Sequence, residues 1–286
     1  MTFIQVAMLA IVQGLAELLP VSSSAHVIVA EKLMGLDPTA PSMTLLLVML
    51  YTGTMFAVIL YFWNEWKATY FASKEAFRRS AGTIVLATAA TGGVGLALLK
   101  LIPYAIGADR KTFEIEQLFG NPLLIAGGLA AAGVMIVWSG LSRRAPLPHE
   151  RIDPKAALAI GAVQGLCLPF RGFSRSGATI STGLSMGIAR RQAEAFSFAL
   201  AVVLTPAVIV KEGYRFIQAN AAIANPSAGL MQLAWPSLVG MALSFVAGLG
   251  ALRWLSRWLE QGRWHYFGFY CLAAAAFVLA ARHWMH

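Results

Sequence analysis

The stretch VQGLAELLPVSSSAH, residues 12–26, decides the fold, because an apolar helix pattern stops inside it at Pro20. Proline cannot continue a helix, and the serines that follow it are preferred residues at a helix N-terminus. We therefore predict a second short helix from the serines to Met34. The apolar region 3–35 is interpreted as two half-length helices joined by a polar turn.

The composition places this break inside a membrane protein. Hydrophobic residues make up 58% of the 286 residues, charged residues only 12%, and the mean hydropathy is +0.67. Soluble proteins carry roughly 25% charged residues, so a water-soluble globule is excluded. The formal net charge of +9 is dispersed between apolar runs, which suits membrane topology, and we predict no binding of nucleic acid.

The same pattern returns in the second half of the chain as VQGLCLPFRGFSRSGAT, residues 163–179. Here Pro169, Gly172 and Gly177 interrupt an apolar region at residues 156–190. Non-helical backbone at membrane depth is tolerated only where it is buried in protein or lines a wet cavity. Both broken regions, 3–35 and 156–190, are therefore predicted to be re-entrant helical hairpins.

Six further segments are apolar over the roughly 20 residues that a helix needs to cross a bilayer. They are residues 42–63, 81–101, 121–141, 195–216, 231–252 and 264–284. Each hairpin is followed by three of them. Because three is an odd number, the second copy crosses the membrane in the opposite orientation to the first. The predicted fold is an all-α polytopic membrane protein, a single integral membrane domain over 1–286. Its inverted-topology repeats are residues 1–141 and 156–286, each a hairpin plus three transmembrane helices.

The distribution of Lys and Arg predicts the orientation, because cytoplasmic loops carry an excess of cations. One side holds Lys67, Lys74, Arg78, Arg79, Arg143, Arg144, Arg151, Lys155, Arg190, Arg191, Arg253, Arg257 and Arg263. The other side holds fewer: Lys32, Lys100, Arg110, Lys111, Lys211, Arg215 and Arg282. The first side is predicted to be cytoplasmic, which places both termini and the first hairpin on the outer face.

The first hairpin carries polar residues that are costly in a membrane and usually mark a site. Gln13 and Glu17 are four residues apart and share a helix face, and His26 follows on the next helix. Ser22, Ser23 and Ser24 stand at a predicted helix N-terminus, which attracts anions. Structural alternatives exist: Glu17 could serve as a hydrogen-bond partner of the serine-rich turn, and His26 as an interior histidine.

The second hairpin resembles an anion cradle. Its turn combines guanidinium groups, hydroxyls and glycine at another helix N-terminus, with Arg171, Gly172, Ser174, Arg175, Ser176 and Thr179 as candidate ligands. Arginine binds phosphate oxygens bidentately, and glycine lets the backbone approach them. Arg171 has an alternative role as a snorkelling interfacial residue. If the two breaks meet, their residues can bind a pyrophosphate with Mg²⁺ or Ca²⁺ between it and Glu17.

Glu194, Lys211 and Glu212 lie near span ends and are interpreted as interfacial residues. Cys167 and Cys271 lie in apolar stretches without a CxxC motif, so we predict neither a disulfide nor a zinc site.

These residues resemble the undecaprenyl-diphosphate phosphatase family, the bacitracin-resistance membrane phosphatases, which carry (E/Q)xxxE and PGxSRSxxT motifs. Residues 13–17 match the first motif, and residues 172–179 match nearly all of the second. The resemblance covers the whole chain, including the serine-rich stretch from Val21 to His26. Arg171 departs from the family, because it replaces the proline that precedes the glycine.

The resemblance implies metal-dependent hydrolysis of undecaprenyl diphosphate to the monophosphate carrier lipid used in peptidoglycan synthesis, and hence a role in bacitracin resistance. It implies a bacterial inner-membrane protein whose active site opens to the periplasmic face. Glu17 is then the metal ligand or acid/base, and Arg175 the phosphate clamp. Ser23 with His26 as its base is the favoured nucleophile, while direct attack by His26 stays open. Gln13, Ser22, Ser24 and the second-hairpin residues bind substrate.

A different class of function shares this architecture, since inverted repeats with broken helices are common among secondary transporters. The alternative is therefore a transporter that flips a polyprenyl phosphate lipid. It needs cations for the head group but no nucleophile, so the pairing of Ser23 with His26 favours hydrolysis. Expected partners are the polyprenyl diphosphate substrate and membrane lipids. The sequence allows a homo-oligomer and does not fix the oligomeric state.

Overall fold

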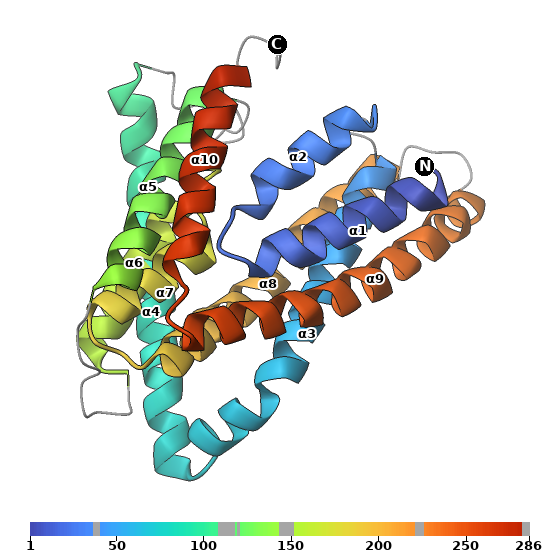
Figure 1. The fold of residues 1–286 in the computed structure, drawn as a ribbon. Helices are drawn as coiled ribbons and strands as arrows, with labels where there is room; N and C mark the ends of the chain where they lie inside the picture. The colour runs from blue at the N-terminus through green and yellow to red at the C-terminus, as the bar shows by residue number, and fades with distance from the viewer. Residues whose placement is uncertain (37–40, 108–117, 119–120, 143–151, 221–225, 282–286) are drawn as a thin grey trace. The chain divides into compact units, whose positions relative to one another are not determined.

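The computed structural model describes residues 1–36, 41–107, 118, 121–142, 152–220 and 226–281. Within these ranges the chain forms ten α-helices and no strand (Figure 1). They are α1 (Phe3–Leu18), α2 (Ser23–Leu33), α3 (Pro41–Thr69), α4 (Lys74–Ala105), α5 (Pro122–Leu141), α6 (Pro154–Cys167), α7 (Arg175–Ser185), α8 (Arg190–Asn220), α9 (Pro226–Glu260) and α10 (His265–Ala281). The all-α fold is confirmed.

Five of the described helices are long and apolar enough to cross a membrane, which agrees with a polytopic membrane protein. The qualifying segments are Met43–Thr69, Lys74–Ala105, Pro122–Leu141, Arg190–Tyr214 and Trp235–Glu260. The predicted span 264–284 corresponds to α10, which has 17 residues. The end of that span lies outside the described residues, as do the cations Arg110, Lys111, Arg143, Arg144, Arg151 and Arg282. The number of six spans stays a prediction.

Both predicted helix breaks are present. Helix α1 ends before Leu19, whose backbone is extended, and Ser22 adopts a left-handed φ of 69° before α2 begins. Helix α6 ends at Cys167, and α7 begins after Ser174, whose hydroxyl accepts a hydrogen bond from the Gly177 backbone N–H. Gly172 in between has a φ of 100°, a value that favours glycine. Proline, serine and Gly172 thus end and restart each helix where the sequence predicts. The prediction that Gly177 interrupts the helix is wrong, because Gly177 lies inside α7.

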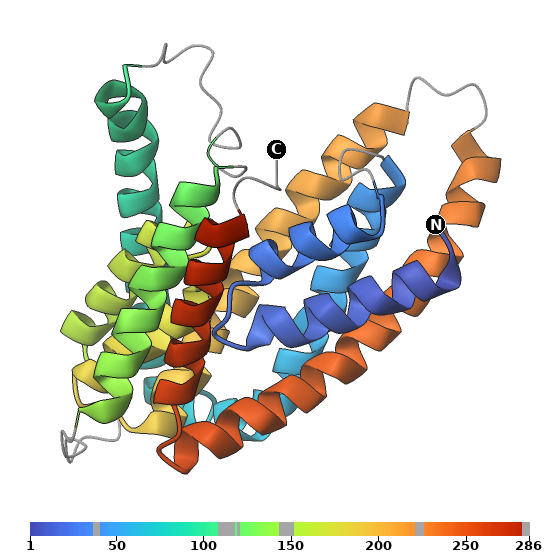
Figure 2. The same cartoon turned by 45° about the horizontal axis from the view of Figure 1, so that its top comes forward.

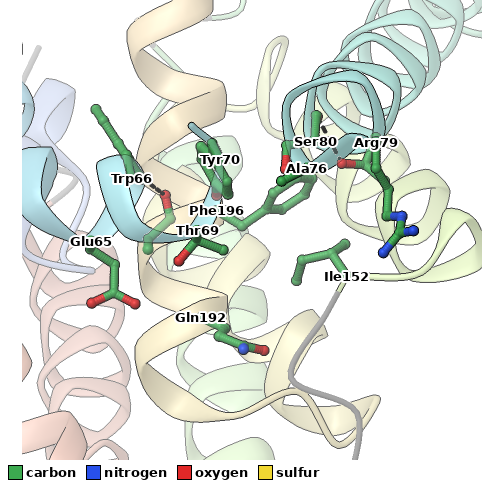
Figure 3. Close-up of a pocket in the computed structure, with 12 residues that line it drawn as sticks. Glu65, Trp66, Thr69, Tyr70, Ala76, Arg79, Ser80, Ile152, Gln192 and Phe196 are labelled. Atoms are coloured by element: carbon green, nitrogen blue, oxygen red, sulfur yellow. Dashed lines mark hydrogen bonds between the residues drawn. The ribbon is translucent and has the colours of Figure 1, made fainter. Parts of the chain in front are cut away.

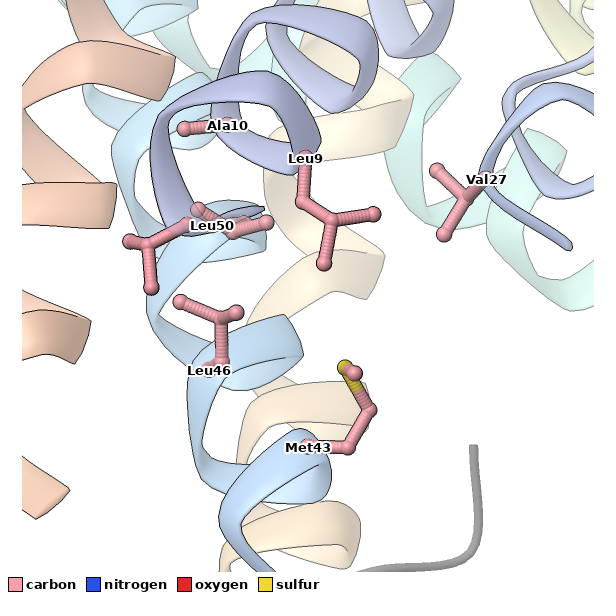
Figure 4. Close-up of a cluster of buried hydrophobic side chains, with 7 residues drawn as sticks. Leu9, Ala10, Val27, Met43, Leu46 and Leu50 are labelled. Carbon is pink, nitrogen blue, oxygen red and sulfur yellow. The ribbon is translucent and has the colours of Figure 1, made fainter. Parts of the chain in front are cut away.

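The chain divides into two compact units, and each unit takes segments from both halves of the sequence. Unit 1 contains Met1–Leu19, Ser23–Trp63 and Ala201–Leu255, and unit 2 contains Pro20–Ser22, Asn64–Leu200 and the chain from Ser256. In unit 1 a buried apolar cluster joins α1, α2 and α3 through Val6, Leu9, Ala10, Val27, Met43, Leu46 and Leu50 (Figure 4). Its members recur every three or four residues along α1 and α3, which places them on one face of each helix.

Helix α1 also runs beside α9 in unit 1 (Figures 1 and 2). A Cβ atom added at Gly14 would lie 2.7 Å from the backbone oxygen of Ser244 and 2.7 Å from the Cβ atom of Ala247. The Ser244 hydroxyl donates to the Leu50 carbonyl oxygen on α3, at 2.9 Å. Lipid tails are as apolar as leucine, so close van der Waals contact and interhelical hydrogen bonds hold helices together in a membrane. Glycine and serine supply both here.

Unit 2 repeats this kind of contact between α6 and α4. Gly161 faces the Ala87 carbonyl oxygen so closely that an added Cβ atom would clash with it. The Thr91 hydroxyl on α4 donates to the Gly161 carbonyl oxygen at 2.9 Å and accepts from the Gln164 side-chain amide at 3.1 Å. Helices α5 and α10 approach each other in the same way at Gly133 and Gly268.

We expect Gly161→Ala to destabilise the protein by about 1–3 kcal/mol, because the new methyl group pushes α6 away from α4. Gly92→Ala is the matched control on α4, since a Cβ atom there meets no atom of the described residues within 4 Å. The measurement is the fraction of protein that stays monodisperse in detergent after heating. If the monodisperse fraction after heating fell equally in the two variants, the contact of α6 with α4 would not limit stability.

Candidate active site

The first hairpin gathers two polar side chains around one carboxylate. The Gln13 side-chain amide donates to Glu17 Oε2 at 3.2 Å, and the Ser23 hydroxyl donates to the same oxygen at 2.7 Å. The spacing of Gln13 and Glu17 brings them together on α1, and the return of the chain at Pro20 brings Ser23 back to them. The carboxylate of Glu17 therefore orients the hydroxyl of Ser23.

The other predicted residues of this hairpin lie around the same turn. His26 is half-buried on α2, three residues after Ser23, a spacing that places two side chains on one helix face. Ser22 is buried in the left-handed position before α2 and belongs to unit 2. The side chain of Ser24 lies outside what the structure describes.

The side chain of Gln13 has an oxygen that is ready for a ligand. Gln13 is only 1% exposed, and its Oε1 atom has no hydrogen-bond partner among the described residues. A buried acceptor without a partner costs about 1–3 kcal/mol. Together with the Glu17 carboxylate and the Ser23 hydroxyl it forms a set of oxygen donors, which is the chemistry that Mg²⁺ and Ca²⁺ prefer.

This donor set is too small for a metal site made of protein alone. The described residues contain no group of three or more His, Cys, Asp or Glu side chains that could hold a metal ion. Mg²⁺ commonly takes only one or two carboxylates and completes its shell with water and substrate phosphates. The residues therefore fit a divalent cation that is shared with a phosphate substrate.

The second hairpin presents the N-terminus of α7 beside two half-buried arginines. Arg175 is the first residue of α7, and Arg171 precedes the turn glycine. Ser174 and Ser176 are buried, and their hydroxyl oxygens are 3.5 Å apart. The first N–H groups of a helix have no partner within the helix, and with the helix dipole they attract anions.

Helix α5 fixes the shape of this turn. A Cβ atom at Gly172 would clash with the Ile125 carbonyl oxygen, so its left-handed backbone and its close packing both require glycine. One turn further along α5, Gly128 leaves room for the backbone of Arg171 and Phe173. The turn thus keeps its glycine geometry although Arg171 stands where the family motif has proline.

Thr179 has a structural contact that its predicted role did not include. Its side chain is fully buried, and its hydroxyl lies 2.8 Å from the Arg175 carbonyl oxygen and 2.6 Å from the Ser197 hydroxyl on α8. Thr179 therefore holds α7 against α8. Its assignment as a direct phosphate ligand stays a prediction.

Sequence reasoning missed a buried charge network in unit 2. Glu194 is 0% exposed, so it is enclosed by protein and is not an exposed interfacial residue as expected. It accepts a hydrogen bond from Ser256 and pairs with Arg191 at 3.8 Å, while Arg191 also pairs with Glu65 at 3.5 Å. The three-residue spacing of Arg191 and Glu194 was the available signal, because such residues are neighbours on a helix.

A cavity of about 70 Å³ lies at the ends of α3, α4 and α8 in unit 2 (Figure 3). Glu65, Tyr70, Arg79 and Gln192 line it, and the Trp66 indole N–H donates to the Ala195 carbonyl oxygen beside it. Burial raises the pKa of Tyr70, and the nearby Glu65 carboxylate raises it further. Its described lining contains none of the predicted site residues, so it is treated as a space apart from both helix breaks.

Comparison with known proteins agrees with these features. The family model described as "Bacitracin resistance protein BacA" matches residues 6–277. The chain is 58% identical over 280 residues to "Undecaprenyl-diphosphatase 2" of Acinetobacter baylyi, covering 98% of both chains. It is 31% identical over 276 residues to "Undecaprenyl-diphosphatase" of Rhodopirellula baltica, covering 96% of both. Because these matches cover nearly the whole sequence, the chain belongs to the BacA family of bacitracin resistance proteins.

Proposed function

We propose that this chain is an integral membrane phosphatase that hydrolyses undecaprenyl diphosphate to undecaprenyl phosphate and inorganic phosphate. The reaction recycles the carrier lipid for peptidoglycan synthesis. Membership of the BacA family and the names of its relatives support this activity. The observation in the structure that carries it is the contact of Ser23 with Glu17, because a hydroxyl held by a carboxylate beside a histidine is suited to attack phosphorus.

In the proposed mechanism the Ser23 hydroxyl, which donates to Glu17 before the reaction, turns its proton to His26 as Ser23 Oγ attacks the terminal phosphorus. The bond from that phosphorus to the bridging oxygen breaks, and undecaprenyl phosphate leaves with the bridging oxygen. Water then attacks the phosphoserine, the bond from phosphorus to Ser23 Oγ breaks, and His26 returns its proton to that oxygen. The attacking water loses one proton to the solvent, and inorganic phosphate leaves. Glu17 holds the Ser23 hydroxyl in place for the first step.

A divalent cation, Mg²⁺ or Ca²⁺, is part of the proposal. Glu17 and the side-chain oxygen of Gln13 would hold it. When bound, such an ion offsets negative charge on the transferring phosphoryl group. In the second hairpin Arg175 clamps the phosphate oxygens, and Ser174, Ser176 and the backbone of Gly172 border them, since guanidinium groups and helix N-termini stabilise phosphoryl charge.

The proposed architecture is an inverted-topology repeat with two re-entrant hairpins whose breaks meet near the bilayer midplane. Helices α6–α10 repeat the order of α1–α5, because each series begins with two short helices, α1 and α2 or α6 and α7, and continues with three longer ones. Gly14 and Gly165 hold equivalent places in the repeated VQGL motif, and each faces the backbone of a neighbouring helix, α9 and α4 respectively. These parallels support the repeat.

We place the protein in the bacterial inner membrane with the site open to the periplasmic face. The excess of cations on the side with residues 64–80 and 253–263 supports this orientation. The hydrolase is favoured over the alternative, a transporter of a polyprenyl phosphate lipid, because a lipid transporter has no use for an oriented nucleophile.

The test is phosphate release from undecaprenyl diphosphate by the purified protein in detergent. We expect release with Mg²⁺ or Ca²⁺, loss of release with a chelator, and recovery when the ion is restored. Ser23→Ala is expected to give no release, because it lacks the attacking oxygen. Full activity in chelator would contradict the metal, and no release under any ion would contradict the phosphatase.

A further inference from the structure

Two adjoining cavities lie at one end of unit 2, away from both helix breaks. The first, about 470 Å³, lies between Ser139 of α5, Ser142 just after that helix, the start of α8 and the turn from α9 to α10; we call it the head cavity. The second, about 430 Å³, is lined by Val134, Val137, Trp138, Leu141, Ser142 and Leu272; we call it the tail groove. Ser142 lines both, so the two spaces are neighbours at the end of α5.

The head cavity is polar and basic. Arg190 and Arg191, the first two residues of α8, line it, and Glu260 is the acidic residue among its described lining. Arg191 is already paired with Glu65 and Glu194, so Arg190 is the cation on which ligand binding depends. Arg190 donates one hydrogen bond to the Glu260 carbonyl oxygen at 2.9 Å. A guanidinium group has five N–H donors in a fork that matches phosphate, so Arg190 keeps donors for a ligand. Ser139 and Ser142 add hydroxyls.

The tail groove is apolar, and it faces outward from α5. Val134, Trp138 and Leu141 recur along one face of this helix, and the Trp138 side chain is 73% exposed. Leu272 of α10 forms the other wall. The groove starts at Ser142, where α5 ends, and follows the helix away from the basic residues. A charged cavity beside an apolar groove matches an amphiphile with an anionic head and a hydrocarbon chain.

We propose that this pair of cavities binds an anionic glycerophospholipid, with the phosphodiester in the head cavity and an acyl chain in the tail groove. Basic pockets between transmembrane helices on the cytoplasmic side bind the head groups of such lipids, and this end of unit 2 holds Arg190, Arg191, Arg257 and Arg263 of the predicted cytoplasmic set. Glu260 in the lining favours a monoanionic phosphodiester over the more highly charged phosphomonoester of a polyprenyl phosphate.

This lipid site is independent of the phosphatase reaction. Its lining contains none of the residues assigned to the reaction, although Leu184 and Gly187, at the end of α7, contribute to the head cavity. A bound lipid therefore packs against the far end of the helix that begins with Arg175. Its expected effect is a gain in thermal stability, because a ligand that binds only the folded state stabilises it.

The test uses purified, delipidated full-length protein in detergent, to which phosphatidylglycerol, phosphatidylcholine, undecaprenyl phosphate or inorganic phosphate is added. Binding is read by native mass spectrometry and by the shift in melting temperature. We expect phosphatidylglycerol to bind and to raise the melting temperature, with little effect of the other three. Ser142→Asp and Arg190→Gln are expected to weaken phosphatidylglycerol binding about tenfold or more.

Ser142→Asp adds a negative charge between the cavities, which should repel an anionic lipid. It keeps the proposal testable if Arg190→Gln loosens the end of α9 and does not fold. Ser142→Ala and Arg78→Gln are the controls and should bind like the parent protein, since Arg78 is exposed on α4 and lines neither cavity. Equal binding by Ser142→Asp would overturn the proposal. So would an equal response to phosphatidylcholine, or a response to undecaprenyl phosphate alone.

Discussion

Replacing Glu17 with alanine is expected to lower phosphate release from undecaprenyl diphosphate by about 10³-fold, within the range that positioned acid–base groups contribute. The loss is large because one carboxylate serves two purposes in the proposed mechanism: it accepts the hydrogen bond from Ser23, and it would supply the charged ligand for the cation. Glu17→Gln should fail similarly, since it keeps the size of the side chain but removes its charge. The measurement is the initial rate of phosphate release at saturating Mg²⁺ or Ca²⁺.

Glu75→Ala is the matched control, because Glu75 is an exposed carboxylate in the first turn of α4. It should retain the parental rate. Thermal stability of each variant in detergent separates lost chemistry from lost folding. A Glu17→Ala protein that is folded and turns over at the normal rate would remove the first hairpin from the active site.

Replacing Arg175 with alanine is expected to lower kcat by about 10²–10³-fold, the usual cost of removing a donor that stabilises charge in the transition state. Arg175 begins α7, where the helix N-terminus also favours an anion. Arg175→Lys should recover only part of the rate, because an ammonium group cannot form the bidentate pair that a guanidinium group forms with phosphate. Separate kcat and KM values distinguish this loss from weaker substrate binding.

Arg78→Ala provides the control for removal of one exposed cation. An Arg175→Ala variant that changes KM alone would assign Arg175 to binding of the ground state. Normal values of both constants would contradict its place in the site.

The sequence predicts the helix breaks well because their causes are local. Pro20 and Gly172 act through their own backbone, and the spacing of Gln13 and Glu17 places both on one helix face whatever surrounds them. Residues with strong local preferences therefore fix where each hairpin turns and which polar groups lie on α1.

The missed features depend on contacts between segments that are distant in the sequence. Thr179 faces Ser197 because α7 packs on α8, and Gln164 meets Thr91 because α6 packs on α4. Glu194 is buried because Ser256, from the end of α9, reaches it. A carboxylate near the end of an apolar span is usually interfacial, and only packing reveals when protein encloses it.

The glycines at helix contacts also could not be recognised from the local sequence. Gly161 and Gly133 look like ordinary members of apolar helices, and nothing local distinguishes them from Gly92. Only their neighbours separate them, since Gly161 and Gly133 meet the backbone of another helix while Gly92 meets open space. Helix association in a membrane depends on such close approach.

The central claim is that the two helix breaks come together to form one site, and a cross-link between them tests it most directly. Val21→Cys and Phe173→Cys, one in each break, are introduced after Cys167 and Cys271 are changed to alanine. A disulfide needs Cα atoms within about 7 Å, and short bismaleimides extend this reach. Thr179→Cys with Ser197→Cys is the positive control, because the native hydroxyls are 2.6 Å apart.

Oxidation or short bismaleimides in the membrane, followed by mass spectrometry of the linked peptides, reports the distance. The account predicts that residues 21 and 173 are joined, and that undecaprenyl diphosphate changes the yield because it occupies the space between them. The shared site would be contradicted if the control cysteines at 179 and 197 were cross-linked while the cysteines at 21 and 173 were not joined by any reagent.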